Sequence, residues 1–269
     1  MQRNITVLSD RVPALAGLAS VFQSVLEHDK YVYGLWLNDP VSLLWSRAPH
    51  SIEEDKRPAN FLHKIPGIPS WSWASQNCPV LWSRPSYHIP EWTPDLIFAS
   101  VKGLVQTELH DQIHLRGPLL LPDLKALSLR NGITDQSPHL VSSFHAWPAE
   151  TMYINPDPSL RKEIDWSSLS QSLVSGTDGP SAIPLLYLMP MVKDRYRSYD
   201  GKFDLHEAHC VLLRRENEHG TAVYTRVGVA MLFSTSDNFF ELFSQHQLNL
   251  GKDDYIDMDS AGTCTITVI

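Results

Sequence analysis

The stretch Ile65-Pro66-Gly67-Ile68-Pro69-Ser70-Trp71-Ser72-Trp73-Ala74-Ser75 is the most distinctive part of this 269-residue sequence. Its two tryptophans alternate with small residues. In an extended strand, this alternation places Trp71 and Trp73 on one face and leaves the other face flat enough for a neighbouring backbone to approach. Pro66 and Pro69 favour an extended approach, because the residue before a proline is disfavoured in the helical region. The stretch therefore predicts a strand with one bulky and one flat face.

The two indoles of this stretch have two interpretations. Each buried tryptophan removes about 150–250 Å² from water, and aromatic pairs at strand spacing belong to the core more often than to a ligand-stacking platform. Core packing is therefore favoured. If the indoles are core, Trp73→Ala should cost about 3–5 kcal/mol and reduce soluble yield.

The composition is that of a globular protein with either one large domain or two smaller ones. Hydrophobic residues make up 43% of the chain and charged residues 19%, a balance that excludes a mainly disordered chain. The formal net charge is −8. Because nucleic-acid binding depends on a concentrated basic patch, we expect no nucleic-acid partner.

The cysteines and the hydrophobic runs bear on the compartment. Cys78, Cys210 and Cys264 lie far apart and form no CxxC pair, which fits a reducing compartment. The first ten residues lack the apolar core of a signal peptide, and no run approaches the about 18 apolar residues of a membrane span. We expect a cytoplasmic protein without a membrane span.

A helix is predicted near the N-terminus, from about residue 10 to 27. Asp10 is a good N-cap residue and Pro13 suits a first turn. Apolar residues follow with helical spacing, so one stripe should be buried. These residues are Val12, Leu15, Ala16, Ala19, Phe22, Val25 and Leu26.

The remainder of the chain is rich in strand patterns. Tyr31–Leu37 and Val41–Trp45 predict a hairpin around Asn38-Asp39-Pro40, and Ile113–Leu121 alternates as a half-buried strand. Further strands are predicted at Leu185–Met191, Ala208–Leu213, Ala222–Phe233 and Thr263–Ile269, and short helices at Ser159–Leu173 and Asp237–Gln245. In the long strand, the odd-numbered residues from Val223 to Phe233 should share one face.

Together these patterns predict an α+β fold that is mainly β. The N-terminal helix should pack on a twisted antiparallel sheet, and the C-terminal strands should extend the same sheet or form a second one. We expect residues 1–121 to form a helix-plus-sheet region, residues 122–182 an irregular insertion or linker, and residues 183–269 a β-rich region.

No segment carries a recognisable catalytic motif. GxSxG, GxGxxG and GxxxxGK[ST] are absent. His206-Glu207-Ala208-His209-Cys210 is the only metal-like cluster, but a strand would place its two histidines on opposite faces. We therefore expect no metal, no cofactor and no catalytic residue.

Several motifs resemble those of fungal heterokaryon-incompatibility (HET domain) proteins. Arg3-Asn4-Ile5-Thr6 and Asp10-Arg11-Val12-Pro13-Ala14-Leu15-Ala16-Gly17-Leu18-Ala19 resemble the family's "R-x-L-T…D-R/K-L-P-A-L-S-G-L-A". Tyr31–Trp36 is similar to "Y-L-A-G-L-W", Leu43-Leu44-Trp45 to "L-L-W" and Tyr224–Val229 to "Y-x-R-V-G". Pro69–Ser75 matches "P-S-W-S-W-A-S". Residues 122–182 match nothing in the family.

The resemblance implies the C-terminal region of such a protein. The family's N-terminal block, with its "Y-x-A-L-S-Y-x-W-G" signature, has no counterpart here, and any NAD-cleaving residue would lie in that block. Ala16 and Tyr33 replace the family's more common serine and alanine. Residues carried over as structural or interaction signatures are Asp10, Gly17, Gly34, Trp36, Trp45, Pro69, Ser70, Trp71, Ser72, Trp73, Ala74, Ser75, Arg226 and Gly228.

The function expected from this resemblance is non-catalytic. The chain would act in fungal self/non-self recognition and regulated cell death by contacting a partner protein, and a surface left open by the missing block would favour self-association. One alternative is a hydrolase-like enzyme with scattered His, Asp and Ser residues. A second alternative is a carbohydrate-binding β-sandwich that uses Trp71, Trp73 and Trp82.

Overall fold

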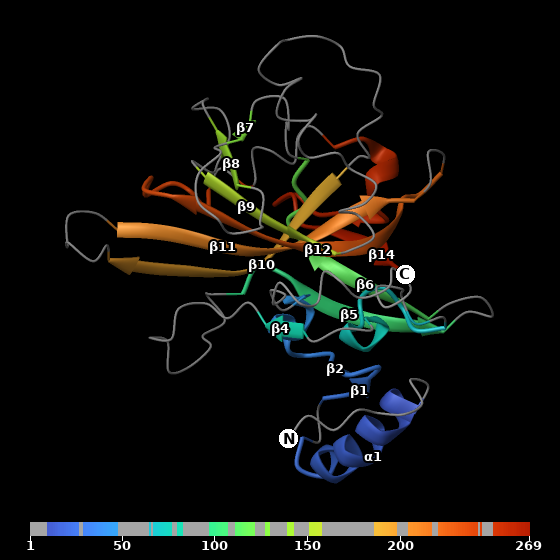
Figure 1. Cartoon of the computed structure of the whole chain (residues 1–269). Coiled ribbons are helices and arrows are strands. Elements are labelled where there is room, and N and C mark those ends of the chain that lie inside the picture. The colour runs from blue at the N-terminus through green and yellow to red at the C-terminus, as the bar shows by residue number, and fades with distance from the viewer. Residues whose placement is uncertain are drawn as a thin grey trace.

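The architecture is a large twisted sheet with a small helical unit at one end (Figure 1). The computed structural model describes residues 10–26, 29–47, 65, 67–76, 80–82, 97–106, 111–121, 127–129, 139–142, 151–157, 186–197, 204–216, 220–241, 243 and 250–269. The predicted helix at Ser159–Leu173, Cys78 and most of the predicted linker lie outside these residues.

The described elements are one α-helix and a series of strands with three short 3-10 helices. The α-helix is α1 (Arg11–Gln23), and the 3-10 helices are Pro40–Leu43, Trp73–Ser75 and Lys252–Asp254. The strands in the first half are β1 (Tyr31–Val32), β2 (Leu35–Trp36), β3 (Trp45–Arg47), β4 (Val80–Trp82), β5 (Ser100–Gln106), β6 (Asp111–Gly117) and β7 (Leu127–Leu129). Those in the second half are β8 (His139–Ser142), β9 (Thr151–Pro156), β10 (Leu186–Arg197), β11 (Asp204–Arg215), β12 (Val223–Ser234), β13 (Asp257–Met258) and β14 (Cys264–Val268).

Ten of the described strands form one sheet, and β12 lies at its centre. Along one path the order is β5-β6-β14-β12-β9-β8-β7, while β10 and β11 join β12 from its other edge and β13 pairs with β14. Every described pair is antiparallel except β12 with β14, which is parallel. Strands from all three expected regions therefore belong to one sheet, and the C-terminal strands extend it.

The sheet is buried on both faces around β11 and β12. Val211 and Leu213 belong to one core cluster, whereas Ala208, Cys210 and Leu212 belong to the other. This alternation follows the two-residue period of a strand. Ile113 and Leu115 of β6 are fully buried between half-buried neighbours, so the predicted half-buried strand is confirmed.

The prediction that β12 presents one apolar face along its whole length is wrong. Opposite β11, Leu212 pairs with Gly228 while Leu213 pairs with Arg226, so Val227 is an extra residue at a bulge. A bulge shifts the alternation by one residue. Val227, Ala230 and Leu232 therefore lie in one cluster, and Tyr224 and Val229 in the other.

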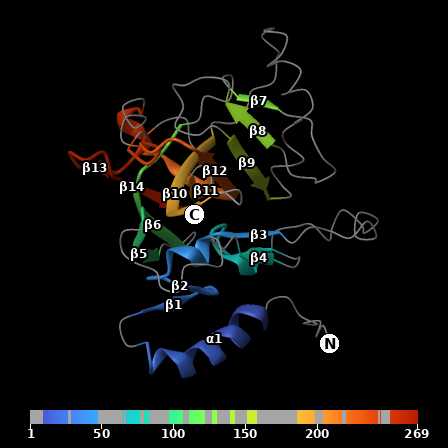
Figure 2. The same cartoon turned by 90° about the vertical axis from the view of Figure 1, so that its left-hand side faces the viewer.

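The fold class predicted from the sequence, α+β and mainly β, is confirmed, but the helix buries much less than expected. Figures 1 and 2 both show α1 at the end of the molecule, beside β1 and β2 and away from the large sheet. Of its residues only Ala19 is buried. The predicted buried stripe of α1 is therefore wrong. None of the helices in the described residues is long and apolar enough to cross a bilayer.

The predicted hairpin around Asn38-Asp39-Pro40 is also wrong. The hairpin is β1–β2, and its turn is Tyr33-Gly34. Asp39 and Pro40 instead begin a 3-10 helix, where Asp39 Oδ1 accepts a hydrogen bond from the Val41 N–H at 3.0 Å. The reason is that Asp is a strong N-cap residue and Pro suits a first helical position. Of the predicted helix at Asp237–Gln245, residues 237–241 form a series of turns and Phe243 is helical, while the other residues lie outside the described ones.

A buried polar cluster fixes the segment before β13. The hydroxyl of Tyr187 donates to Asp254 Oδ1 at 3.0 Å, and Arg215 Nη1 donates to the same oxygen at 2.6 Å. The hydroxyl of Tyr224 donates to the backbone carbonyl of Asp254 at 2.8 Å. Burial, and then the Asp254 carboxylate beside it, raise the pKa of Tyr187 to about 12.

This cluster predicts a loss of stability at high pH. The folded-state pKa of Tyr187 lies above its unfolded value of 10.0. The stabilisation that the protonated Tyr187 hydroxyl gives to the folded state is therefore complete below pH 10 and disappears as the pH rises to about 12. Urea unfolding between pH 8 and 12 should show a fall in the free energy of unfolding that is steeper in the wild type than in Tyr187→Phe. Equal slopes in the two proteins would contradict this assignment.

Candidate functional site: a buried tryptophan and arginine junction and an exposed helix face

The tryptophan stretch is a turn followed by a 3-10 helix, so the prediction of a strand is wrong. The N–H of Ser72 donates to the carbonyl of Pro69, and that of Ser75 donates to the carbonyl of Ser72, both at 3.1 Å. The Ser72 hydroxyl also accepts from the N–H of Ala74 at 3.1 Å. Serine side chains that bond to the nearby backbone compete with strand pairing, which explains why the alternation of large and small residues is misleading here.

Trp71 is a core residue. Its side chain is 0% exposed, and its ring meets that of Tyr33 edge-on with 5.7 Å between centroids. Its backbone carbonyl accepts a hydrogen bond from Nε1 of Trp45 at 3.1 Å. Core packing is therefore confirmed for Trp71, which cannot stack a sugar.

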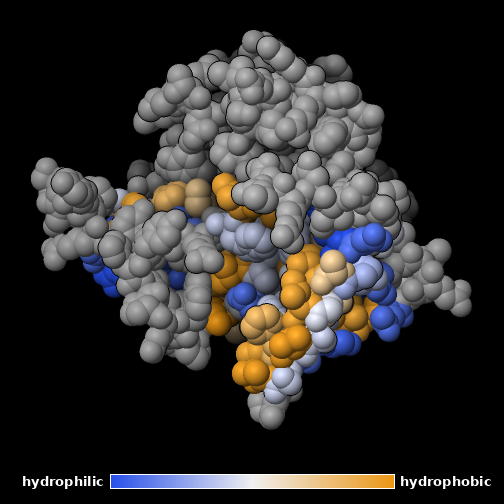
Figure 3. Space-filling model, turned by 60° about the horizontal axis from the view of Figure 1, so that its bottom comes forward, coloured by the Kyte–Doolittle hydropathy of each residue, from blue (hydrophilic) through white to orange (hydrophobic). Residues whose placement is uncertain are grey.

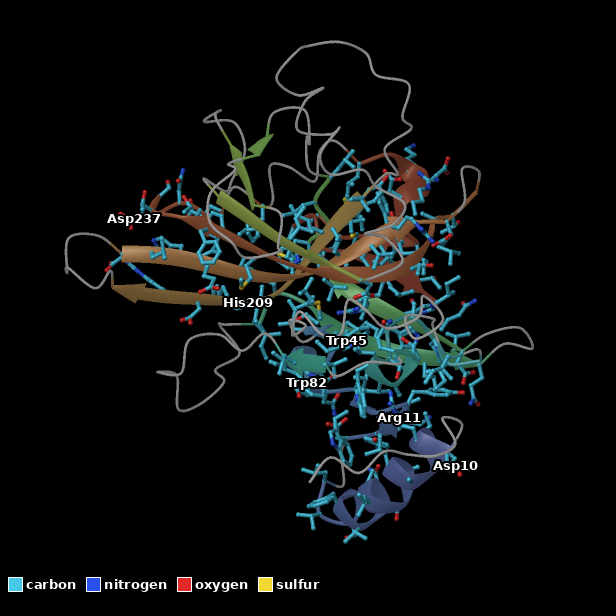
Figure 4. The ribbon with its side chains drawn as sticks, in the orientation of Figure 1. Asp10, Arg11, Trp45, Trp82, His209 and Asp237 are labelled. Atoms are coloured by element: carbon cyan, nitrogen blue, oxygen red, sulfur yellow. The ribbon has the colours of Figure 1, made fainter. Side chains whose placement is uncertain are left out.

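Trp73 is half-buried and holds the β1–β2 turn. Its Nε1 donates to the carbonyl of Gly34 at 2.8 Å, while the Ser72 hydroxyl donates to the carbonyl of Tyr33. The outer edge of Trp73 meets Trp82, whose ring centroid lies 5.9 Å away. Trp82 is 40% exposed and pairs across β3–β4 with Trp45. Figure 4 shows Trp45 and Trp82 between α1 and the large sheet.

Gly34 is required at this contact for two reasons. Its φ is +91°, a backbone conformation that residues with a Cβ rarely adopt. A Cβ at this position would also collide with Nε1 of Trp73 and lie 2.9 Å from its Cε2.

Gly34→Ala should lower the free energy of unfolding by about 3–4 kcal/mol, since a clash adds to the backbone strain. Gly67→Ala is the matched control, because Gly67 has φ +78° but open space around it. It should cost about 1–2 kcal/mol in the same urea titration. Equal losses would show that the indole contact contributes nothing.

Arg226 lies at the centre of a buried junction that also contains Trp45, Trp71, Trp73 and Asp157. Its Nη1 donates to Asp157 Oδ2 at 3.1 Å, its Nε donates to the Leu43 carbonyl at 3.2 Å, and its Nη2 donates to the Trp45 carbonyl. The guanidinium carbon lies 3.3 Å from the centroid of the Trp45 ring, a cation–π contact. Burial lowers the pKa of Arg226 to about 10, against the opposing charge of Asp157. The side chain therefore remains cationic at neutral pH.

The neighbours of Arg226 connect the junction to the centre of the sheet. The N–H of Arg226 donates to the Ser70 hydroxyl at 3.0 Å, and that hydroxyl donates to the backbone carbonyl of Ile269. Gly228 follows at the bulge of β12 with φ +154°. Pro69, Ala74 and Ser75 are also buried. The signature residues from Pro69 to Ser75 thus lie together with Gly34, Trp45, Arg226 and Gly228.

The remaining signature residues lie outside this contact network. Trp36 is half-buried and meets Tyr31 edge-on at 5.1 Å between centroids. Asp10 precedes α1 without a side-chain capping bond, and Gly17 lies on α1 with nothing within 4 Å of a Cβ position. Most signature residues therefore lie at the junction, whereas Asp10 and Gly17 are exposed at α1 and Trp36 is half-buried on β2.

The buried junction has little capacity for chemistry. The Arg226 side chain is 0% exposed, and its charge is balanced by Asp157. The two histidines of the predicted metal-like cluster have different neighbours. His206 packs against Phe240 with 5.5 Å between ring centroids, whereas Nε2 of His209 lies 3.2 Å from Oε1 of Glu207. Among the described residues, no group of three or more His, Cys, Asp and Glu side chains could hold a metal ion. Asp157 is the residue of this junction that the sequence did not indicate.

The largest group of exposed apolar residues among the described ones lies on the outer face of α1. An apolar band of Ala14, Leu18, Val21, Phe22, Val25 and Leu26 faces solvent, with Leu18 64% and Val25 78% exposed. Figure 3 shows these hydrophobic residues gathered along α1 on the face turned to the viewer. The sequence predicted the apolar residues but not their exposure, because periodicity alone does not reveal which side of a helix is covered.

The ends of α1 are held by the rest of the protein. Arg11 Nη1 donates to the carbonyl of Gln76, just after the tryptophan turn, at 2.6 Å. Near the other end, Gln23 Nε2 donates to the carbonyl of Asp29, and Gln23 Oε1 accepts from the N–H of Tyr31 at 3.4 Å. Gln76 therefore holds one end of the helix, Asp29 and Tyr31 hold the other, and the apolar band remains open to solvent.

Comparison with models of known protein families, with curated proteins and with solved structures found no match to this chain.

Proposed function

We propose that this chain is a non-catalytic module that contacts a partner protein through the apolar band of α1. The exposure of that band is the observation that carries the proposal. Residues 12–26 contain no Asp, Glu, Lys, Arg or His. A helix without a charged face is normally covered, and a contiguous exposed apolar patch marks an interaction surface.

The buried junction supports the proposal by giving the signature residues a structural role. The ring of Trp71 packs against Tyr33, Nε1 of Trp73 donates to the Gly34 carbonyl, and Arg226 pairs with Asp157. They act as a scaffold that positions α1 through the bond from Arg11 to Gln76. A rigid scaffold that presents one exposed helix face fits a protein-binding role better than a catalytic one.

The biological setting is proposed from the motif resemblance alone. In that setting the module acts in the cytoplasm of a fungal cell, in self/non-self recognition linked to regulated cell death. No residue of this chain is proposed to cleave NAD. The alternatives of a hydrolase-like site and of a carbohydrate-binding face stand as predictions, the second now without Trp71.

The test compares the wild type with Leu18→Glu/Val25→Glu after chemical cross-linking in fungal cells. Lys30 is exposed near the end of α1, so a bound protein should yield cross-links to it that mass spectrometry identifies. These cross-links should be lost in the double variant. They should persist in Ile256→Glu, because Ile256 is 45% exposed but lies outside α1. Equal cross-linking in all three proteins, or cleavage of NAD by the purified chain, would overturn the proposal.

A further inference from the structure

A single row of side chains joins α1 to the rest of the protein. Arg11, Leu15, Ala19 and Gln23 recur every four residues along one side of the helix, and each is buried or half-buried. Of the other residues of α1, only Val12 is half-buried, and the remainder are exposed. The helix lies against β1. Most of its surface therefore contributes nothing to its docking.

The two ends of this row are held by hydrogen bonds. Arg11 Nη1 donates to the Gln76 carbonyl at 2.6 Å, and the Gln23 amide bonds to the carbonyl of Asp29 and to the N–H of Tyr31. Both side chains are only half-buried, so water can replace their partners when these bonds break. Such an exchange makes the net contribution of each bond small. The apolar part of the contact is limited to the few side chains between these ends, of which one alone is buried.

The helix also has little stability of its own. It spans 13 residues, and isolated helices shorter than about 12–15 residues are marginal in water. The Asp10 side chain makes no capping bond, the first turn has no acidic residue and the last turn has no basic one. Gly17, in the middle of the helix, lowers its stability further. An α1 that loses its contacts with the protein should therefore also lose its helical hydrogen bonds.

We propose that α1 is a strap, meaning an element that undocks and unfolds locally while the large sheet remains folded. The strands of that sheet are held far more firmly. In β11, every residue from His206 to Leu213 is buried, and the strand pairs along its length with β10 and β12. Local opening is expected where few apolar contacts hold an element. The inference goes beyond the proposed function, because it concerns how α1 is held and not what it contacts.

The two states of the strap present different surfaces. The docked state covers Val12, Leu15 and Ala19 at least in part and leaves the apolar band exposed. The undocked state exposes the row together with the band. A ligand of the row must therefore bind the undocked state, and its binding would shift the population towards that state. Docking of α1 on the protein is thus an autoinhibitory contact for the row.

Hydrogen exchange of the intact chain, followed by mass spectrometry, tests the strap. Relative to their intrinsic rates, the backbone N–H groups from Leu15 to Gln23 should exchange faster than those from His206 to Leu213 by about a hundredfold or more. Their exchange should be nearly independent of urea below the unfolding transition, because a local opening exposes little surface. Equal protection of the two segments, with the same dependence on urea, would overturn the inference. Exchange of α1 at the rate of an unfolded peptide would also overturn it, since the helix would then not be docked.

Single substitutions test the contacts that hold the strap. Arg11→Met should speed the exchange of α1 by about three- to tenfold, because it removes the bond to Gln76 and leaves a good helix former. Gly17→Ala should slow it by about fivefold, because alanine favours the helix and nothing lies within 4 Å of a Cβ at this position. Arg195→Met is the matched control, because Arg195 also makes a hydrogen bond but lies on β10. It should leave the exchange of α1 unchanged.

The exchange of β11 and the cross-linking of α1 separate the remaining outcomes. Arg11→Met should leave the exchange of β11 unchanged, and an equal increase in both segments would show that α1 opens only with the whole protein. If α1 exchanges as expected but Leu18→Glu/Val25→Glu keeps every cross-link, the strap stands and the proposed function fails. If α1 is as protected as β11 but the cross-links are lost, the proposed function stands and the strap fails.

Discussion

Arg226→Met should lower the free energy of unfolding by about 3–5 kcal/mol, because it leaves a buried carboxylate without its cation. Asp157 is 3% exposed and lies 3.1 Å from Arg226 Nη1. The variant also deprives the carbonyls of Leu43 and Trp45 of their donor. An unsatisfied buried acceptor adds to the loss. Urea unfolding measured by circular dichroism would give the change.

The matched control for this prediction is Arg195→Met. Arg195 also pairs with a carboxylate, Asp204 at 2.7 Å, but its side chain is 58% exposed. Exposed ion pairs contribute at most about 1 kcal/mol. The double variant Arg226→Met/Asp157→Asn should be more stable than Arg226→Met, since it removes the uncompensated charge. A loss in Arg226→Met no larger than that in Arg195→Met would contradict the role of the junction.

Trp71→Ala should cost about 3–5 kcal/mol, because it removes a large side chain from a closed part of the core and leaves a cavity. Trp73→Ala should cost less than the sequence indicated, since Trp73 is only half-buried. Trp82→Ala should cost least, because 40% of Trp82 is exposed. Unfolding of the three variants should therefore rank Trp71, Trp73 and Trp82 in order of decreasing loss.

This ranking also separates packing from ligand binding. If Trp71→Ala folds with wild-type stability, the indole does not stabilise the core and its assignment as a core residue is wrong. If Trp82→Ala is stable but abolishes binding to an oligosaccharide array that the wild type binds, the carbohydrate alternative gains support. Binding that persists in Trp82→Ala would exclude its exposed ring as a stacking surface.

The sequence predicted those features that depend on a local pattern. The alternation of Ile113 and Leu115 with polar residues predicted a strand with one buried face, and in β6 these two residues are buried between half-buried neighbours. Burial of Trp71 followed from its size. The opposite placement of His206, which packs against Phe240, and His209, which lies beside Glu207, followed from the same two-residue period.

The features that the sequence did not predict depend on contacts between distant segments. The Ser72 hydroxyl turns the tryptophan stretch into a 3-10 helix, and its second partner is the carbonyl of Tyr33. The bulge at Val227 is set by pairing with β11 and reverses the faces of β12. Asp157 becomes important only because the fold brings it to Arg226. No local pattern carries that information.

The position of β14 has a consequence for how the chain folds. β14 pairs with β6 on one side and with β12 on the other, and the thiol of Cys264 donates to the carbonyl of Gly117 across a separation of 147 residues. Contacts at such separations are slow to form, since loop closure must precede any gain from pairing. During synthesis, the edge of β6 that pairs with β14 therefore stays unpaired until β14 has left the ribosome. We expect this interval to be the period in which the nascent chain depends most on chaperones.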